Sequence, residues 1–133
     1  AARGQAAFGA CMACHQVGGA GPDYGPDLTA FGAQQPREVI ANAIANPSSE
    51  IAHGYDGMEL KTNEGLTIVG IVLSNGDPVV MKSVGGVVQR VPRSRLASLK
   101  PLGRSLMYEP SQLGLDAQKV ADIVAYLKSL KAP

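Results

Sequence analysis

The 133-residue chain has no tryptophan and few other aromatic residues, with only two phenylalanines and four tyrosines. Long hydrophobic runs are also missing. The longest largely apolar stretch, Leu66–Leu73, is far shorter than the roughly 20 residues that a membrane-spanning helix needs. Aromatic side chains normally supply much of the volume of a protein core. Their scarcity therefore predicts that another apolar group completes the core, and no membrane span is expected.

The chain also lacks an excess of charge of either sign. Twelve Lys and Arg residues balance eleven Asp and Glu residues, for a formal net charge of +1. This balance argues against a general nucleic-acid binder and against a polybasic membrane binder. The length and the 45% content of hydrophobic residues fit one globular domain that spans residues 1–133.

Cysteine and histidine are scarce, but three of these residues stand together in the sequence. Cys11 and Cys14 are followed directly by His15, and the only other histidine is His53. A zinc site is poorly supported because such a site needs three or four ligands. The pattern Cys-x-x-Cys-His is typical of c-type haem attachment, in which two thiols form thioethers and the histidine binds the iron. One covalent haem c is therefore expected, and a buried or redox-active cysteine pair is the alternative.

A haem iron held by His15 has a sixth position, and several residues are candidates for it. Met12 is excluded because it lies between the two cysteines. The remaining candidates are Met58, Met81, Met107 and His53. Ligation by His53 would lower the reduction potential, and an open position would suit small-ligand sensing or peroxidase-like chemistry.

Helical patterns occur at both ends of the chain. A short helix is expected over Arg3–Met12, and a second begins at Pro36 and ends near Asn46. Between them, residues 17–28 are too rich in Gly and Pro for a helix or a central strand. A last helix is capped by Asp116, and its apolar residues repeat at intervals of three and four: Val120, Ile123, Val124, Leu127 and Leu130.

The middle of the chain has a different character. Four short segments are separated by good reverse-turn sequences and predict a small antiparallel meander. They are Glu59–Thr62, Leu66–Leu73, Val79–Lys82 and Val87–Val91. We expect this meander to be an insertion, at about residues 55–100, in a mostly α-helical domain.

Together these motifs resemble a class I cytochrome c. The resemblance lies in G-Q-A-A-F-G-A-C-M-A-C-H at residues 4–15, G-P-D-L at 25–28 and D-I-V-A-Y-L-K-S-L at 122–130. It implies a mostly α cytochrome c fold in which the terminal helices cross over a covalently bound haem. The residues at that crossing would be Gly4, Phe8, Tyr126 and Leu127.

The middle segment is similar to the β-rich insertion of a haem-binding domain. That domain occurs at the C-terminus of large dehydrogenase-like proteins of planctomycete and verrucomicrobial type. The shared elements are E-G-L-T-I-V-G at 64–70, V-P-R-S-R-L at 91–96 and S-L-M-Y at 105–108. Tyr108 stands where that family usually has proline.

The resemblance also implies roles for individual residues. His15 and Met107 would be the axial ligands, and the carbonyl of Pro26 would accept a hydrogen bond from the histidine ring. Independently of the resemblance, Tyr24, Arg93 and Arg95 are candidate partners for the haem propionates; the alternative for the arginines is a solvated surface position.

The implied function is electron transfer rather than catalysis. Redox proteins would be the partners, among them a dehydrogenase or a terminal oxidase. The chain shows no Gly-rich nucleotide loop and no nucleophile triad, so substrate oxidation would take place on another chain. The implied compartment is the periplasm or an equivalent space. A secretion leader, which does not precede Ala1, would have been removed or left out of the sequence.

Basic residues gather in the second half of the chain. Between Pro78 and Tyr108 there is no Asp or Glu, and the basic residues there are Lys82, Arg90, Arg93, Arg95, Lys100 and Arg104. A local positive field of this kind steers an acidic redox partner. The alternative is a solvated β surface whose charges neutralise the haem propionates.

Overall fold

The computed structural model describes residues 2–130, which form two compact units. The first, the helical unit, comprises residues 2–50 and 107–130 of the described chain. The second, the β unit, comprises residues 51–106. The helices of the helical unit are α1 (Ala2–Ala7), the 3-10 helix η1 (Phe8–Cys11), α2 (Thr29–Gln34), α3 (Arg37–Ala45), the 3-10 helix η4 (Pro110–Leu113) and α4 (Ala117–Ser129).

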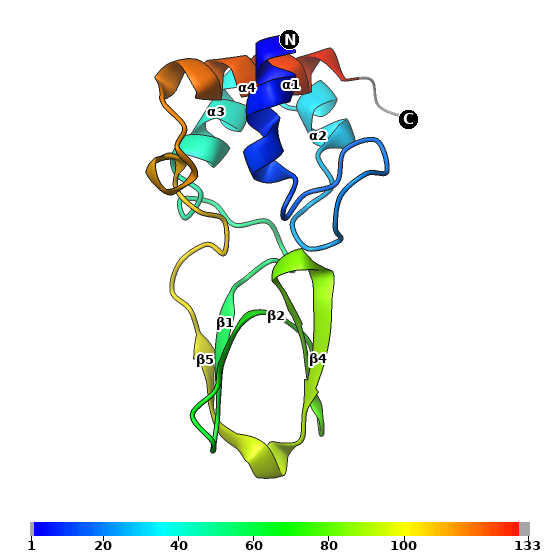
Figure 1. Cartoon of the computed structure of the whole chain (residues 1–133), viewed down its shortest axis with the longest axis vertical. Coiled ribbons are helices and arrows are strands. Elements are labelled where there is room, and N and C mark those ends of the chain that lie inside the picture. The colour runs from blue at the N-terminus through cyan, green and yellow to red at the C-terminus, as the bar shows by residue number, and fades with distance from the viewer. Residues whose placement is uncertain (1, 131–133) are drawn as a thin grey trace. The chain divides into compact units, whose positions relative to one another are not determined.

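The first and last helices cross in close contact, with α1 passing over α4 (Figure 1). A Cβ atom at Gly4 would lie only 1.9 Å from the backbone oxygen of Asp122. The ring centroids of Phe8 and Tyr126 lie 5.4 Å apart. Helix α2 approaches α4 in the same manner, because a Cβ atom at Gly32 would lie 2.1 Å from the backbone oxygen of Leu127. Glycine thus allows two helices to pack against the α4 backbone.

Helix α4 anchors the helical core. It begins at Asp116, whose side chain accepts a hydrogen bond of 2.8 Å from the backbone N–H of Lys119, as the sequence predicts. The buried residues of this core are Phe8, Cys11, Ile40, Ile44, Leu115, Ile123, Val124 and Leu127. Helix α2 lies just after the predicted Gly/Pro-rich loop and was not predicted, because it is short and contains Gly32. Among residues 2–130, no helix is both long and apolar enough to cross a membrane.

The β unit contains one antiparallel sheet of five strands in the order β4-β3-β2-β1-β5. Its strands are β1 (Met58–Thr62), β2 (Thr67–Asn75), β3 (Val79–Ser83), β4 (Val87–Val91) and β5 (Leu96–Pro101). Short 3-10 helices follow β3 and β4, namely η2 (Val84–Gly86) and η3 (Arg93–Arg95). Strands β1 to β4 form the predicted meander, and β5 adds to the free side of β1, where Leu99 faces Leu60.

The sheet has a hydrophobic core of its own. Leu60, Val79, Met81 and Val91 are buried together, and apolar residues from β1, β2 and β5 pack against them. Inward-facing residues alternate with outward-facing ones, as in β3, where Val79 and Met81 are buried and Val80 is half-exposed. The β unit is therefore a packed body rather than a set of surface hairpins.

The prediction of a mostly α fold is wrong. The structure is 37% helix and 25% strand, and the strands form a five-stranded sheet. Two features account for the difference. The insertion holds one more strand than predicted and builds its own core, and the helices other than α4 are short because Gly/Pro-rich loops interrupt them.

Candidate functional site

The Cys-x-x-Cys-His motif forms one tight turn at the end of η1. The backbone N–H groups of Cys14 and His15 both donate to the carbonyl of Cys11, at 3.1 and 3.0 Å. Neither cysteine is in a disulfide, and Cys11 is buried whereas Cys14 is half-buried. The turn therefore presents two thiols and an imidazole from five consecutive residues.

The thiols are protonated at neutral pH. Burial, and secondly the neighbouring Cys14, raise the pKa of Cys11 to about 11, and burial also raises the pKa of Cys14. Among residues 2–130 there is no cluster of three or more His, Cys, Asp or Glu side chains that could hold a metal ion.

The ring of His15 is buried and held in one orientation. Its Nδ1 donates a hydrogen bond of 2.7 Å to the backbone carbonyl of Pro26. Because a carbonyl only accepts, this bond assigns the proton of the neutral ring to Nδ1 and leaves Nε2 with a lone pair. Burial lowers the pKa of His15, and the bond to Pro26 opposes this effect in part. The ring is therefore neutral at pH 7 and suited to binding a metal through Nε2.

The Gly/Pro-rich loop wraps around this turn. The N–H of Gly25 donates to the carbonyl of Cys14 at 2.6 Å, and the N–H of Leu28 donates to the carbonyl of Gln16 at 2.9 Å. A Cβ atom at Gly25 would lie 2.7 Å from Cε1 and 2.8 Å from Nδ1 of His15. The missing side chain at Gly25 is what lets the backbone lie against the ring.

We expect a Gly25→Ala substitution to displace the ring of His15. The added methyl group would disrupt the hydrogen bond to Pro26, and overpacking of this kind costs about 2 kcal/mol. Denaturant unfolding measures this loss. Gly9→Ala is the matched control, because a Cβ atom at Gly9 would meet nothing within 4 Å. Equal stability of the two variants would contradict the role assigned to Gly25.

The sixth-ligand candidates lie in different parts of the chain. Met107 is half-buried and packs against the core of the helical unit. Met81 is fully buried in the core of the β unit, and Met58 packs against the same core. His53 is exposed in the loop before β1. Only Met107 thus shares a compact unit with His15.

Tyr24 lies beside the attachment segment. Its side chain is buried, and burial raises the pKa of its phenol, with further contributions from Cys14 and Tyr108. Tyr24 therefore stands near both Cys14 and the segment that carries Met107. Its predicted role towards a propionate stays a prediction.

Arg93 and Arg95 belong to the β unit, where both are engaged. Arg93 donates to the carbonyls of Asn75 and Gly76, at 3.0 and 2.9 Å, and to the side chain of Asn75. Arg95 forms an ion pair with Glu64 at 3.1 Å. These guanidinium groups hold turns of the sheet, and their predicted role as propionate partners stays a prediction.

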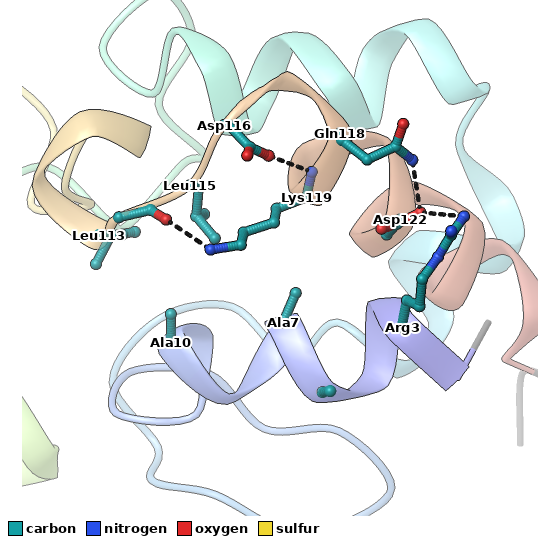
Figure 2. Close-up of a pocket in the computed structure, with 11 residues that line it drawn as sticks. Arg3, Ala7, Ala10, Leu113, Leu115, Asp116, Gln118, Lys119 and Asp122 are labelled. Atoms are coloured by element: carbon teal, nitrogen blue, oxygen red, sulfur yellow. Dashed lines mark hydrogen bonds and ion pairs between the residues drawn. The ribbon is translucent and has the colours of Figure 1, made fainter.

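A separate groove of about 590 Å³ lies between α1 and the start of α4 (Figure 2). Alanines of α1 and Leu115 line it, and an ion pair of 3.2 Å joins Arg3 to Asp122 at one side. None of Cys11, Cys14 and His15 lines this groove. It is therefore distinct from the Cys-x-x-Cys-His turn.

The residues of the turn fit a covalently attached haem. Two unbridged thiols stand on one turn, and the imidazole beside them is neutral with Nε2 available. A model of the cytochrome c family matches residues 1–67. The chain belongs to the cytochrome c family. None of the curated proteins matches the chain.

Membership of the cytochrome c family has consequences for function. It supports haem-based electron transfer by a carrier rather than an enzyme, with covalently bound haem c and redox proteins as partners. Cytochrome c domains are typically extracytoplasmic. The match includes the attachment turn, α2, α3 and β1, and it ends at the first residue of β2.

Two structural features near the candidate residues were not predicted from the sequence. One is the contact of Gly25 with the ring of His15. The other is a capping box at η4. The side chain of Glu109 accepts a hydrogen bond from the backbone N–H of Gln112, and the side chain of Gln112 accepts one from the backbone N–H of Glu109. The second has a sequence signal, since Glu109 and Gln112 have the three-residue spacing of a capping box.

Proposed function

We propose that the chain carries single electrons through one haem c, held by thioethers to Cys11 and Cys14, with His15 and Met107 as axial ligands. The observation that carries this proposal is the hydrogen bond of 2.7 Å from Nδ1 of the buried His15 to Pro26. It orients the imidazole and leaves Nε2 with a lone pair, on the same turn as the two thiols. When bound, haem c supplies a one-electron ferric/ferrous couple.

The chain's own residues have separable tasks in this proposal. Pro26 fixes the ring of His15 and makes it a stronger donor. The thioether sulfur of Met107 favours the reduced state and raises the potential. If His15 and Met107 both held the iron, they would leave no coordination position for a substrate, as expected of a carrier rather than an enzyme.

The test is the visible spectrum of Met107→Ala. Wild-type holoprotein is expected to show sharp ferrous c-type bands and a weak far-red ferric band that reports sulfur on iron. Met107→Ala should abolish the far-red band, keep the covalent haem, and bind carbon monoxide readily when reduced.

Met58→Leu and Met81→Leu are the controls, because both keep an apolar side chain in the core of the β unit. Loss of the far-red band in either control, or its survival in Met107→Ala, would exclude Met107 as ligand. Absence of that band from the wild type would favour His53 or an open site. Absence of any haem spectrum, in a host able to attach haem, would defeat the proposal.

We also expect the capping box to stabilise the segment that carries Met107. Gln112→Ala removes the bond of 3.0 Å from the N–H of Glu109, and loss of such a cap costs about 1 kcal/mol. If that cost falls on the Met107 segment, added imidazole should replace the Met107 sulfur on the iron with about fivefold higher affinity in Gln112→Ala than in the wild type. Titration of the ferric spectrum with imidazole measures this affinity.

Gln118→Ala is the control, because it lies in the exposed first turn of α4 and should leave the affinity for imidazole unchanged. An equal change in both variants would exclude the capping box as the cause.

The biological setting follows from the same proposal. We place the chain in the periplasm or an equivalent compartment, as one cytochrome c domain over residues 1–133 with the β unit as its insertion. It would exchange electrons with a dehydrogenase or a terminal oxidase, in the manner of the planctomycete and verrucomicrobial haem-binding domains that it resembles.

A further inference from the structure

The charge of the chain is unevenly divided between its two units. Residues 51–106 contain seven Lys and Arg but four Asp and Glu, for a net charge of +3. The remaining residues contain five Lys and Arg but seven Asp and Glu, for a net charge of −2. Most of the β unit lies beyond the residues that match the cytochrome c family. Its positive charge is therefore a feature of the insertion.

Several of these cations stabilise the β unit itself. Arg93 binds the turn at residues 75–77, Arg95 pairs with Glu64, and Lys100 lies 3.7 Å from Glu59. The side chains of these three residues are thus engaged within the unit. Fewer of the basic residues between positions 78 and 108 are therefore candidates for binding a partner than the sequence suggests. Arg90, on β4, takes part in none of these contacts, and Lys82 lies on the neighbouring strand β3.

The register of these strands brings both cations to one face of the hairpin. Arg90 lies opposite Val80, and Lys82 lies opposite Val88. Directly opposed residues share a face, and so do residues two apart in a strand. The other face carries Val79, Met81 and Val91, which are buried in the core. The outer face therefore combines two cations with valine side chains.

The turn of the same hairpin exposes more apolar surface. Val84 and Val87 are 54% and 53% exposed, and Val88 is 42% exposed. Gly85 and Gly86 between them have φ values of +83° and +79°, which glycine adopts without strain. We call Lys82, Val84, Val88 and Arg90 the hairpin patch; Val87 pairs with Ser83 and lies on the face of Met81. The hairpin patch pairs an apolar centre with positive charge, and no Asp or Glu occurs between residues 78 and 108.

We propose that the hairpin patch docks a protein redox partner whose surface has an apolar centre and an acidic rim. This inference rests on the proposed electron-carrier function and assigns its partner surface to the β unit. Opposite charges raise the encounter rate and select the partner, and the valines add contact area once water is expelled. Arg95 and Lys100, elsewhere in the β unit, instead form ion pairs with Glu64 and Glu59.

Two other occupants fit the patch less well. A bilayer surface is typically engaged by aromatic residues or leucine together with cations, whereas this hairpin end exposes only valine. A second copy that used the same patch would bring Lys82 and Arg90 against like charges. An acidic protein surface meets neither objection.

The experiment uses the holoprotein on gold coated with a mixed monolayer of carboxylate- and methyl-terminated alkanethiols. Surface plasmon resonance measures adsorbed mass without reference to haem, and voltammetry on the same film measures electron exchange. Arg90→Glu should weaken adsorption about three- to tenfold. Val84→Thr/Val88→Thr should weaken it on the mixed film but not on an all-carboxylate film.

Matched controls separate local from general effects. Arg37→Glu makes the same charge change on exposed α3, and Val39→Thr makes the same polar change there; both should adsorb as the wild type does. Equal losses from Arg37→Glu and Arg90→Glu would overturn the proposal. So would Arg90-dependent binding to phosphatidylglycerol vesicles that exceeds binding to the film, or self-association that the patch variants abolish.

Failure of the docking surface is distinguishable from failure of the electron carrier. Each variant's visible spectrum is recorded in solution before adsorption. Intact haem bands with unchanged adsorption would overturn the docking surface alone. Patch-dependent adsorption without a haem spectrum would defeat the electron carrier, and with it the assignment of a redox partner.

Discussion

Produced without haem, the Cys11→Ala/Cys14→Ala double variant is expected to lose most of its helical circular dichroism at 25 °C. Helices α1 and α2 have six residues each and α3 has nine. Isolated helices shorter than about 12 residues are marginal in water, so these elements depend on tertiary packing. Haem would supply the large apolar surface that two phenylalanines and four tyrosines do not.

The β unit is expected to respond differently to loss of haem. Its core is made of its own strands, with Leu60, Val79 and Met81 fully buried. Signal that remains in the far ultraviolet should therefore have the shape of a sheet rather than of a helix. The single variant Cys14→Ala, loaded with haem through the remaining thiol, serves as control and should keep its helices. A helical spectrum from the haem-free double variant would refute this dependence.

A Gly4→Ala substitution is expected to lower the free energy of unfolding by about 3 kcal/mol, at the upper end of ordinary overpacking costs. The new Cβ atom would lie 1.9 Å from the oxygen of Asp122 and 2.7 Å from Cβ of Tyr126. Backbone atoms of a helix cannot rotate away as a side chain does, so α1 must move as a whole. That movement would also separate Phe8 from Tyr126.

Gly9→Ala tests whether the effect belongs to the crossing. Gly9 lies in η1, where an added Cβ atom meets nothing within 4 Å, so its stability should change by less than about 1 kcal/mol. Denaturant titrations of both variants provide the comparison. If Gly4→Ala unfolds at the same denaturant concentration as Gly9→Ala, the close approach of α1 and α4 is not essential for stability.

Features that depend on neighbouring residues were predictable. The turn at Cys11–His15 forms within five residues, and the cap at Asp116 needs only the three residues that follow. Strands β1 to β4 were also predicted, because apolar segments and the turns between them are adjacent in the chain.

Features that depend on distant partners were not predictable. Strand β5 contains alanine, serine and lysine and has little strand character by itself, and it forms by pairing with β1, some 40 residues earlier in the chain. For the same reason the sheet was underestimated and the fold was predicted as mostly α. The use of Arg93 and Arg95 to hold turns likewise depends on residues in other hairpins.

The amino-acid sequence alone determined which chemistry we propose for this protein, because thioether attachment and histidine ligation need residues spaced along one turn. The surroundings of these residues were decided by the tertiary structure alone. It buried the ring of His15 against Gly25 and Pro26, placed Met107 in the same unit and Met81 in the core of another, and gathered Arg90 with exposed valines on one hairpin. Those outcomes depend on packing between segments far apart in the chain, and packing of that kind leaves no local pattern.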